Sequence, residues 1–252
     1  MSYVKTNLSD KNFVDLLEES IKNKTPLSMS RFGDGEIMFL NKNLPQGVKQ
    51  KFKKNWLNND TSISDGEKMV IEILKNALKN TDILGFMDLN NNVCKKMGCR
   101  EKQWSIDEKR IKSMGREKEI KICDHQIART SSLGNPKNIK KILNGEDISI
   151  VSPRVKILKD KKLDKILGCK INYVEIPINY KISDRDKIFE SINNINENII
   201  LFSIGVIGKD MPCYLSNHKN KIALDFGATI DGWAGIKARG WFNNIQNHCL
   251  IK

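Results

Sequence analysis

The chain has 252 residues, which is enough to bury a large core and fits one α/β domain better than two small ones. Its 39% hydrophobic content excludes a wholly disordered chain, and 6 Pro with 16 Gly exclude a collagen-like protein. The 43 basic and 30 acidic residues give a net charge of +13. Such an excess is typical of proteins that bind nucleic acid, an anionic membrane or a phosphorylated substrate, and equally of a solvated lysine-rich surface.

The absence of targeting signals and the spacing of the cysteines indicate in which cellular compartment we expect the protein. Residues 199–208 form the longest apolar run, about half of the roughly 20 residues that a membrane-spanning helix needs. Residues 1–13 lack the apolar core of a secretory signal, so we expect a cytoplasmic protein, with peripheral contact at the inner face of the membrane as an option. The 6 Cys are scattered, which favours reduced thiols over a disulfide framework or a zinc site.

The first half of the chain begins with an amphipathic pattern. Apolar side chains recur at helical spacing, and Ser9 or Asp10 can cap the start. The predicted elements here are a helix over residues 10–22, a strand from residue 27 to 32, a helix over 65–78 and a strand over 82–87. The pattern then weakens between residues 88 and 119, where we expect loops and short helices.

From residue 147 onward, apolar and helical segments alternate regularly. Strands are predicted over residues 148–152, 171–176, 199–204 and 222–226, with helices over 155–167, 184–195 and 209–216. This alternation indicates βαβ units and a parallel sheet. We therefore expect an α/β fold with a Rossmann-like, mostly parallel sheet flanked by helices, in a single domain over residues 1–252.

Ligands bind such sheets at the carboxyl ends of the strands, so the loops that follow the strands are the places to look for chemistry. The first predicted strand runs into the sequence SRFGDGE. Its carboxylates, Asp34 and Glu36, lie on a turn made permissive by glycines and can direct oxygens toward one hard divalent cation. Arg31 could hold phosphate groups beside that cation. A capped turn, in which Asp34 caps a helix and Glu36 complements its dipole, explains the same pattern.

The SRFGDGE segment resembles the signature of the bacterial GT-D-fold glycosyltransferases, a family formerly described as a domain of unknown function. Residues 124–129 (DHQIAR) are similar to a mid-chain acidic segment of that family, and residues 200–205 and 223–227 are similar to its last two strands. The resemblance implies a GT-D-like fold over about residues 26–235. It also implies that the Asp-any-Glu motif, here Asp34 and Glu36, belongs to the nucleotide-sugar site as the ligands of Mn²⁺ or Mg²⁺.

The expected nucleotide-sugar site gathers residues from several of these loops. Its members are Arg31, Phe32, Gly33, Asp34, Gly35, Glu36, Asp124, Arg129, Arg154, Ser203 and Gly205. Backbone N–H groups near Gly205 could approach a phosphate closely, although simple turn glycines fit as well. Arg129 and Arg154 could contact phosphate, with surface salt bridges as the ordinary alternative.

Three residues are candidates for proton transfer. Asp225 and Asp231 each fall near a strand end, where either could deprotonate an acceptor hydroxyl or brace a loop. His125 stands beside Asp124, a pair that could orient a proton or simply form a structural hydrogen bond. Trp104, Trp233 and Trp241 could stack on a sugar, but core packing suits each of them better.

These observations lead to a metal-dependent glycosyltransferase hypothesis. We expect transfer of a hexose from a nucleotide diphosphate sugar, such as UDP-glucose, to a saccharide, lipid-linked or glycoprotein acceptor, in the synthesis of a cell-surface polysaccharide or glycoprotein. Two alternatives are a basic module that binds nucleic acid or a membrane surface without catalysis, and a metal-dependent phosphoryl or nucleotidyl transferase. No signature of specific nucleic-acid recognition is present in the sequence.

Overall fold

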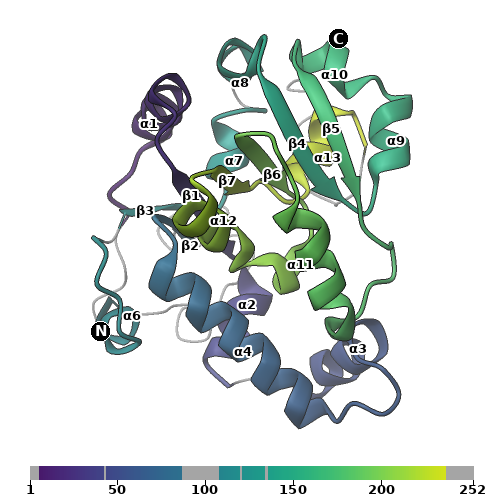
Figure 1. The fold of residues 1–252 in the computed structure, drawn as a ribbon. Helices are drawn as coiled ribbons and strands as arrows, with labels where there is room; N and C mark the ends of the chain where they lie inside the picture. The colour runs from purple at the N-terminus through teal and green to yellow at the C-terminus, as the bar shows by residue number, and fades with distance from the viewer. Residues whose placement is uncertain (1–5, 43, 87–107, 120, 134–135, 237–252) are drawn as a thin grey trace.

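A computed structural model describes residues 6–42, 44–86, 108–119, 121–133 and 136–236 (Figure 1). Within these residues, seven parallel strands form one sheet in the order β3-β2-β1-β7-β6-β4-β5. The strands are β1 (Leu27–Phe32), β2 (Ile83–Phe86), β3 (Lys121–Asp124), β4 (Asp147–Ser152), β5 (Lys170–Glu175), β6 (Ile199–Phe202) and β7 (Ile222–Asp225). The predicted α/β fold with a parallel sheet is confirmed.

Helices cover both faces of this sheet (Figure 1). One face carries α2 (Asp34–Leu40), α3 (Gln46–Trp56), α4 (Ile63–Asn80), α6 (Glu108–Ser113), α11 (Arg185–Asn193) and α12 (Met211–Lys219), with the 3₁₀ turns η2 (Ile182–Asp184) and η3 (Gly205–Gly208). The other carries α1 (Asp10–Asn23), α7 (Ile127–Thr130), α8 (Pro136–Leu143), α9 (Val155–Asp160), α10 (Leu163–Leu167) and α13 (Thr229–Trp233). No helix in the described ranges is long and apolar enough to cross a membrane.

Side chains of the central strands belong to two hydrophobic cores, one on each face of the sheet. Along β6, Ile199 and Leu201 pack into one core, while Ile200 and Phe202 pack into the other. A strand that is buried on both faces needs apolar side chains at every position, not only at alternate ones. For this reason the sequence from residue 199 is a continuous apolar run. The two cores hold the sheet rigid beneath the loops that leave its carboxyl edge.

Most of the predicted elements lie where the sequence places them. The predicted opening helix is α1, and Ser9 caps it by accepting a hydrogen bond from the Asn12 N–H. The prediction of one helix over residues 155–167 is wrong, because Lys162 adopts a left-handed conformation (φ +54°) and separates α9 from α10. Most of the weakly patterned stretch, residues 87–107, lies outside the described residues. Helix α3 is not predicted, since only one of its side chains, Phe52, is buried.

Candidate functional site

The chain leaves the neighbouring strands β1 and β7 toward opposite faces of the sheet. Strand β1 continues into α2, which packs in one core, whereas β7 continues into α13, which packs in the other. At such a switch point the connecting loops diverge and leave a crevice at the carboxyl edge, where ligands of open α/β sheets bind. The residues at this edge are Arg31 at the end of β1 and Asp225 at the end of β7.

Arg31 joins three strands at this edge. Its Nε donates a hydrogen bond of 2.6 Å to the Asp225 carbonyl oxygen, and its backbone N–H donates one of 3.3 Å to Asp225 Oδ2. Its guanidinium also lies 3.5 Å from Asp225 Oδ1 and donates to the His125 carbonyl oxygen beyond β3. The guanidinium therefore connects the ends of β1, β3 and β7.

Two glycines make room for this guanidinium. A Cβ atom at Gly85, in the middle of β2, would lie 2.9 Å from Arg31 Cγ and 3.3 Å from the backbone of His125. A Cβ atom at Gly227, whose φ is +50°, would lie 2.3 Å from the guanidinium itself. Real Cβ atoms do not approach other heavy atoms so closely, so side chains at these positions would displace Arg31.

Lys209 is the second buried cation of the site. It follows η3, is 6% exposed, and places Nζ 2.6 Å from Asp225 Oδ2 and 3.4 Å from Glu36 Oε1. The Ser30 hydroxyl fixes its backbone by donating to the Lys209 carbonyl oxygen at 2.5 Å. Arg31, Glu36, Lys209 and Asp225 together form what we call the charge cluster, with two positive and two negative groups.

Burial and ion pairing act in opposite directions on this cluster. Burial disfavours the Lys209 ammonium, but the carboxylates of Asp225 and Glu36 outweigh it and raise the pKa of Lys209. Burial likewise disfavours the Asp225 carboxylate, but Lys209 and Arg31 outweigh it and hold the pKa of Asp225 below its usual value. Both groups are thus charged at neutral pH.

Glu36 lies in the first turn of α2, where Gly33 precedes the helix. Glu36 Oε2 accepts a 3.0 Å hydrogen bond from the Gly33 N–H, which satisfies one of the free donors at the helix start. The predicted capping of this turn is therefore carried out by Glu36, while Asp34 is the first residue of α2. The side chain of Asp34 lies outside the described part of the structure.

A third group of polar residues lies at the end of β3. Asp124 Oδ1 accepts from the Gln126 N–H at 2.8 Å and lies 3.2 Å from His125 Nδ1. The Gln126 amide contacts His125 Nε2 and accepts a hydrogen bond from Arg129. The chain Asp124–His125–Gln126–Arg129 is thus continuous, and its link to the charge cluster is the His125 carbonyl that binds Arg31.

Asp231 and Arg154 meet on the other side of β7. Asp231 is in α13 and 4% exposed, and its Oδ2 lies 3.8 Å from Arg154 Nε, in the loop after β4. The Arg154 side chain is 41% exposed, so its guanidinium faces solvent as well as Asp231. This pair brings the ends of β4 and β7 together.

Comparisons with known proteins place this chain in a family. The model of the GT-D fold-like domain matches residues 8–233. The chain belongs to this family. It is also similar to the solved structure of a glycosyltransferase (DUF1792) from Streptococcus sanguinis, with a TM-score of 0.60 and 18% identity over 94% of this chain and 84% of that one.

Two further solved structures share the fold. One is described as the highly conserved domain of unknown function 1792 with a distinct glycosyltransferase fold; its TM-score is 0.57 at 18% identity, over 94% of this chain and 86% of that one. A selenomethionine structure of domain of unknown function 1792 has a TM-score of 0.58 at 17% identity, over 96% and 94% of the two chains. No curated protein sequence matches the chain significantly.

In this GT-D fold-like domain, some predicted residues lie away from the crevice. The Phe32 side chain is fully buried and stacks on Phe86 with 5.2 Å between ring centroids, so it packs in the core. Trp233 is also fully buried, and its indole N–H donates to Ser132. Trp104 and Trp241 lie outside the described residues. Ser203, by contrast, directly follows β6 at the carboxyl edge, and its backbone N–H donates a hydrogen bond to the Val151 carbonyl oxygen.

Sequence reasoning missed Lys209, Gly85 and Arg185. Arg185, in α11, binds both carboxylate oxygens of Asp210 at 2.9 and 2.8 Å and donates to the Ile207 carbonyl oxygen, which fixes the loop that presents Lys209. A lysine directly after Gly208, in the glycine-containing loop that follows β6, was the available signal for Lys209. Nothing in the local sequence indicates that Gly85 faces Arg31, because the contact exists only once β1 and β2 pair.

Proposed function

We propose that this GT-D fold-like domain is a glycosyltransferase that moves a hexose from a nucleotide diphosphate sugar, with a UDP-sugar such as UDP-glucose as donor. The acceptor is a saccharide, alone or linked to a lipid or glycoprotein. The observation that carries the proposal is the charge cluster of Arg31, Glu36, Lys209 and Asp225 at the switch point of the sheet. Family membership and the fold shared with glycosyltransferase-fold proteins support the same activity.

The donor chemistry of Glu36 suits a hard divalent cation. Its side chain is 18% exposed, and Oε1 is 3.4 Å from Lys209, longer than a charge-assisted hydrogen bond, so this oxygen can still accept a cation. The described residues contain no cluster of three or more metal-ligating side chains. Mg²⁺ is commonly held by one or two carboxylates together with substrate phosphates. We propose Asp34 and Glu36 as the protein ligands of Mn²⁺ or Mg²⁺, which would neutralise charge on the departing diphosphate.

The neighbouring residues hold this site in place. The Gly33 N–H and Lys209 orient Glu36 from two directions, and Asp225 balances the charges of Lys209 and Arg31. Arg154 keeps an exposed guanidinium at the same edge, where it can form forked hydrogen bonds to a phosphate of the donor. Arg129 would serve the same purpose from the end of β3.

Asp231 is the better candidate for the general base. A base must take a proton from the acceptor hydroxyl, so its carboxylate should not already be held by cations at short range. Asp225 is bound by Lys209 at 2.6 Å and by Arg31, which lower its pKa and weaken it as a proton acceptor. Asp231 lies in α13, which directly follows β7 at the carboxyl edge of the sheet, where substrates of such sheets bind. We therefore assign proton transfer to Asp231 and a structural role to Asp225.

A donor screen tests the proposal. Purified protein is incubated with UDP-glucose and other nucleotide sugars, with and without Mn²⁺, and thermal stabilisation and slow hydrolysis are measured. Release of free monosaccharide and UDP in the presence of Mn²⁺ is expected. Transfer of a nucleotidyl or phosphoryl group would point to the other transferase class. Salt-sensitive binding of generic DNA or acidic vesicles without donor turnover would contradict catalysis altogether.

A further inference from the structure

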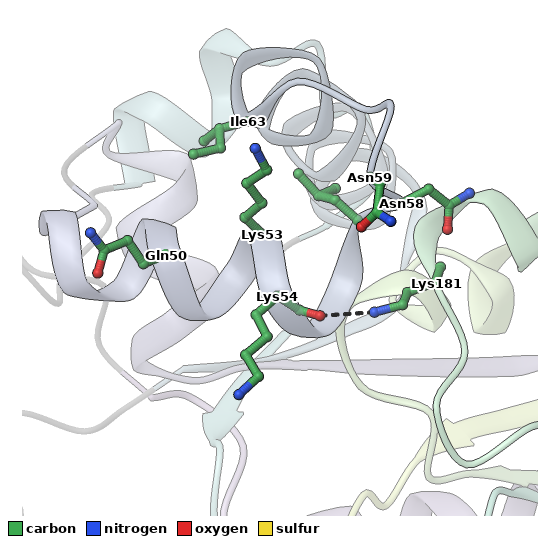
Figure 2. Close-up of a pocket in the computed structure, with 8 residues that line it drawn as sticks. Gln50, Lys53, Lys54, Asn58, Asn59, Ile63 and Lys181 are labelled. Carbon is green, nitrogen blue, oxygen red and sulfur yellow. Dashed lines mark hydrogen bonds between the residues drawn. The ribbon is translucent and has the colours of Figure 1, made fainter.

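A basic cavity lies beside the predicted site, along the surface of α3 (Figure 2). Its volume is about 740 Å³, and its polar lining comprises Gln50, Lys53, Lys54, Asn58, Asn59 and Lys181. Lys53 extends its ammonium toward Ile63, whereas Lys54 points in the opposite direction (Figure 2). Gln50, Lys53 and Lys54 of the basic segment 49–54 thus line a hollow, whereas Lys49 of the same segment pairs with Glu67.

A second cavity continues from the first. It measures about 470 Å³ and shares Lys54 and Lys181 with it, so the two cavities adjoin at these residues; we call the pair of cavities the groove. Here the lining includes the rings of Trp56 and Tyr180, which meet edge to face with centroids 5.5 Å apart. Ile178, with 75% of its surface exposed, adds an apolar side chain that no core contact explains. One end of the groove is therefore basic and the other aromatic.

The aromatic end reaches the same sheet edge as the charge cluster. The Tyr180 hydroxyl donates a 2.6 Å hydrogen bond to the Ile204 carbonyl oxygen, in the loop that leads to Lys209. A Cβ atom at Gly205 would lie 3.0 Å from the Trp56 ring, which shows how closely this loop packs on the groove. Pro153 lines the groove and precedes Arg154, the partner of Asp231. A molecule in the groove would thus lie beside the loops that carry Lys209 and Arg154.

The lysine ammonium groups that line the groove have no acidic ion-pair partner in the described part of the chain. Within the described ranges, no carboxylate forms an ion pair with Lys53, Lys54 or Lys181. Lys181 donates a 2.9 Å hydrogen bond to the Lys54 carbonyl oxygen, which holds its ammonium at the junction of the two cavities (Figure 2). Clustered lysines without acids favour an anionic ligand, and phosphate is the common one.

We propose that the groove binds the acceptor, and that this acceptor is a saccharide carrying a phosphate group. The phosphate contacts Lys53 and Lys181, and the sugar ring lies against Trp56, Tyr180 and Ile178, with its hydroxyls toward the amides. Aromatic faces and amides match ring C–H groups and hydroxyls, whereas a phosphate alone would require only the lysines. The assignment of the ligand as an acceptor rests on the proposed glycosyltransferase function, but the binding site itself is tested separately.

Binding measurements with a defined probe test this proposal. N-acetylglucosamine 1-phosphate is titrated into the full chain in excess UDP, which keeps the donor site filled, and N-acetylglucosamine and inorganic phosphate are titrated for comparison. The variant Lys53→Gln/Lys181→Gln is compared with Lys137→Gln/Lys156→Gln, which makes the same charge change at exposed positions on the opposite face of the sheet. Ile178→Ser, at an exposed position, tests the sugar contact without disturbing the core.

The expected result is a Kd for the probe that rises about tenfold or more in the Lys53/Lys181 variant and is unchanged in the control. Ile178→Ser should weaken the binding of the phosphorylated sugar but leave the binding of inorganic phosphate unchanged. Equal binding by both lysine variants, or no binding of the probe to the wild type, would overturn the proposal. UDP-glucose hydrolysis is measured in parallel: its absence with intact probe binding would refute the glycosyltransferase function and leave the saccharide-phosphate site standing.

Discussion

The ammonium of Lys209 lies 2.6 Å from the carboxylate of Asp225, and both side chains are 7% exposed. Removal of one member leaves the other buried without its partner, which costs more than the pair contributes when intact. Lys209→Met should lower the free energy of unfolding by about 3 kcal/mol. Lys219→Met, at an exposed position at the end of α12, should change it by less than about 0.5 kcal/mol. Urea unfolding of the two variants checks the difference.

The same pair predicts how stability depends on pH. The lowered pKa of Asp225 contributes stability that is present above the unfolded value, about 3.9, and is lost as the pH falls through the folded value. The raised pKa of Lys209 contributes stability that is complete below about pH 10.4 and is lost as the pH rises through the folded value. The free energy of unfolding should therefore decrease both below about pH 3.9 and above about pH 10.4.

Comparison with Asp225→Asn isolates the contribution of Asp225. The variant should be less stable than the wild type at pH 7, and the gap should narrow as the pH falls below about 4, because the wild-type carboxyl then becomes neutral too. Urea unfolding at several pH values measures the gap. A gap that stays constant down to the acid limit would show that Asp225 is not charged in the folded protein.

Gly85 is predicted to be required for the position of Arg31. Gly85→Ala would place a methyl group 2.9 Å from Arg31 Cγ and should lower the unfolding free energy by about 1–3 kcal/mol through overpacking. Gly47→Ala is the matched control, because a Cβ atom there meets nothing within 4 Å. Gly47 lies in α3, so alanine should be neutral or stabilise by up to about 1 kcal/mol. Equal effects in thermal unfolding would contradict the contact.

Glu36 tests the proposed cation site. Glu36→Gln keeps an oxygen that can accept from the Gly33 N–H but removes the negative charge, so the fold should survive. Turnover of UDP-glucose with Mn²⁺ should fall at least about a hundredfold. The additional thermal stabilisation that Mn²⁺ gives the UDP-bound protein should also disappear. Glu190→Gln, at an exposed position on α11, serves as the control and should behave as the wild type. Unchanged metal dependence in Glu36→Gln would refute the assignment.

Asp231 tests the proposed base. Asp231→Asn should lower kcat for transfer by about 10²- to 10⁴-fold, because the amide cannot accept the proton of the acceptor hydroxyl. Thermal stabilisation by UDP should stay unchanged, since the residue does not face the diphosphate in this proposal. A wild-type kcat would exclude Asp231, and a loss of UDP stabilisation would show that its role is to hold the donor.

The elements themselves were largely predictable because they depend on local periodicity. Strands that are buried on both faces appear in the sequence as apolar runs, and Ser9 marks the start of α1 because serine is a common N-cap residue. Where periodicity is weak, prediction fails: α3 buries only Phe52, and the left-handed conformation of Lys162 divides a segment that resembles one helix. The prediction of a single domain over residues 1–252, the cytoplasmic location and any contact with a membrane stay predictions.

The same distinction between local sequence and tertiary structure applies to the candidate site. The sequence singles out Arg31, Asp34 and Glu36 as candidates because they are neighbours in one turn, and the strand-end rule points to Asp225 and Asp231. Their different roles depend on distant residues: Lys209 reaches both Glu36 and Asp225, and Gly85 leaves space for Arg31. Local patterns record which chemical groups stand at a strand end. The charge on each group depends on its burial and its partners, and these arise only when strands far apart in the chain pack side by side.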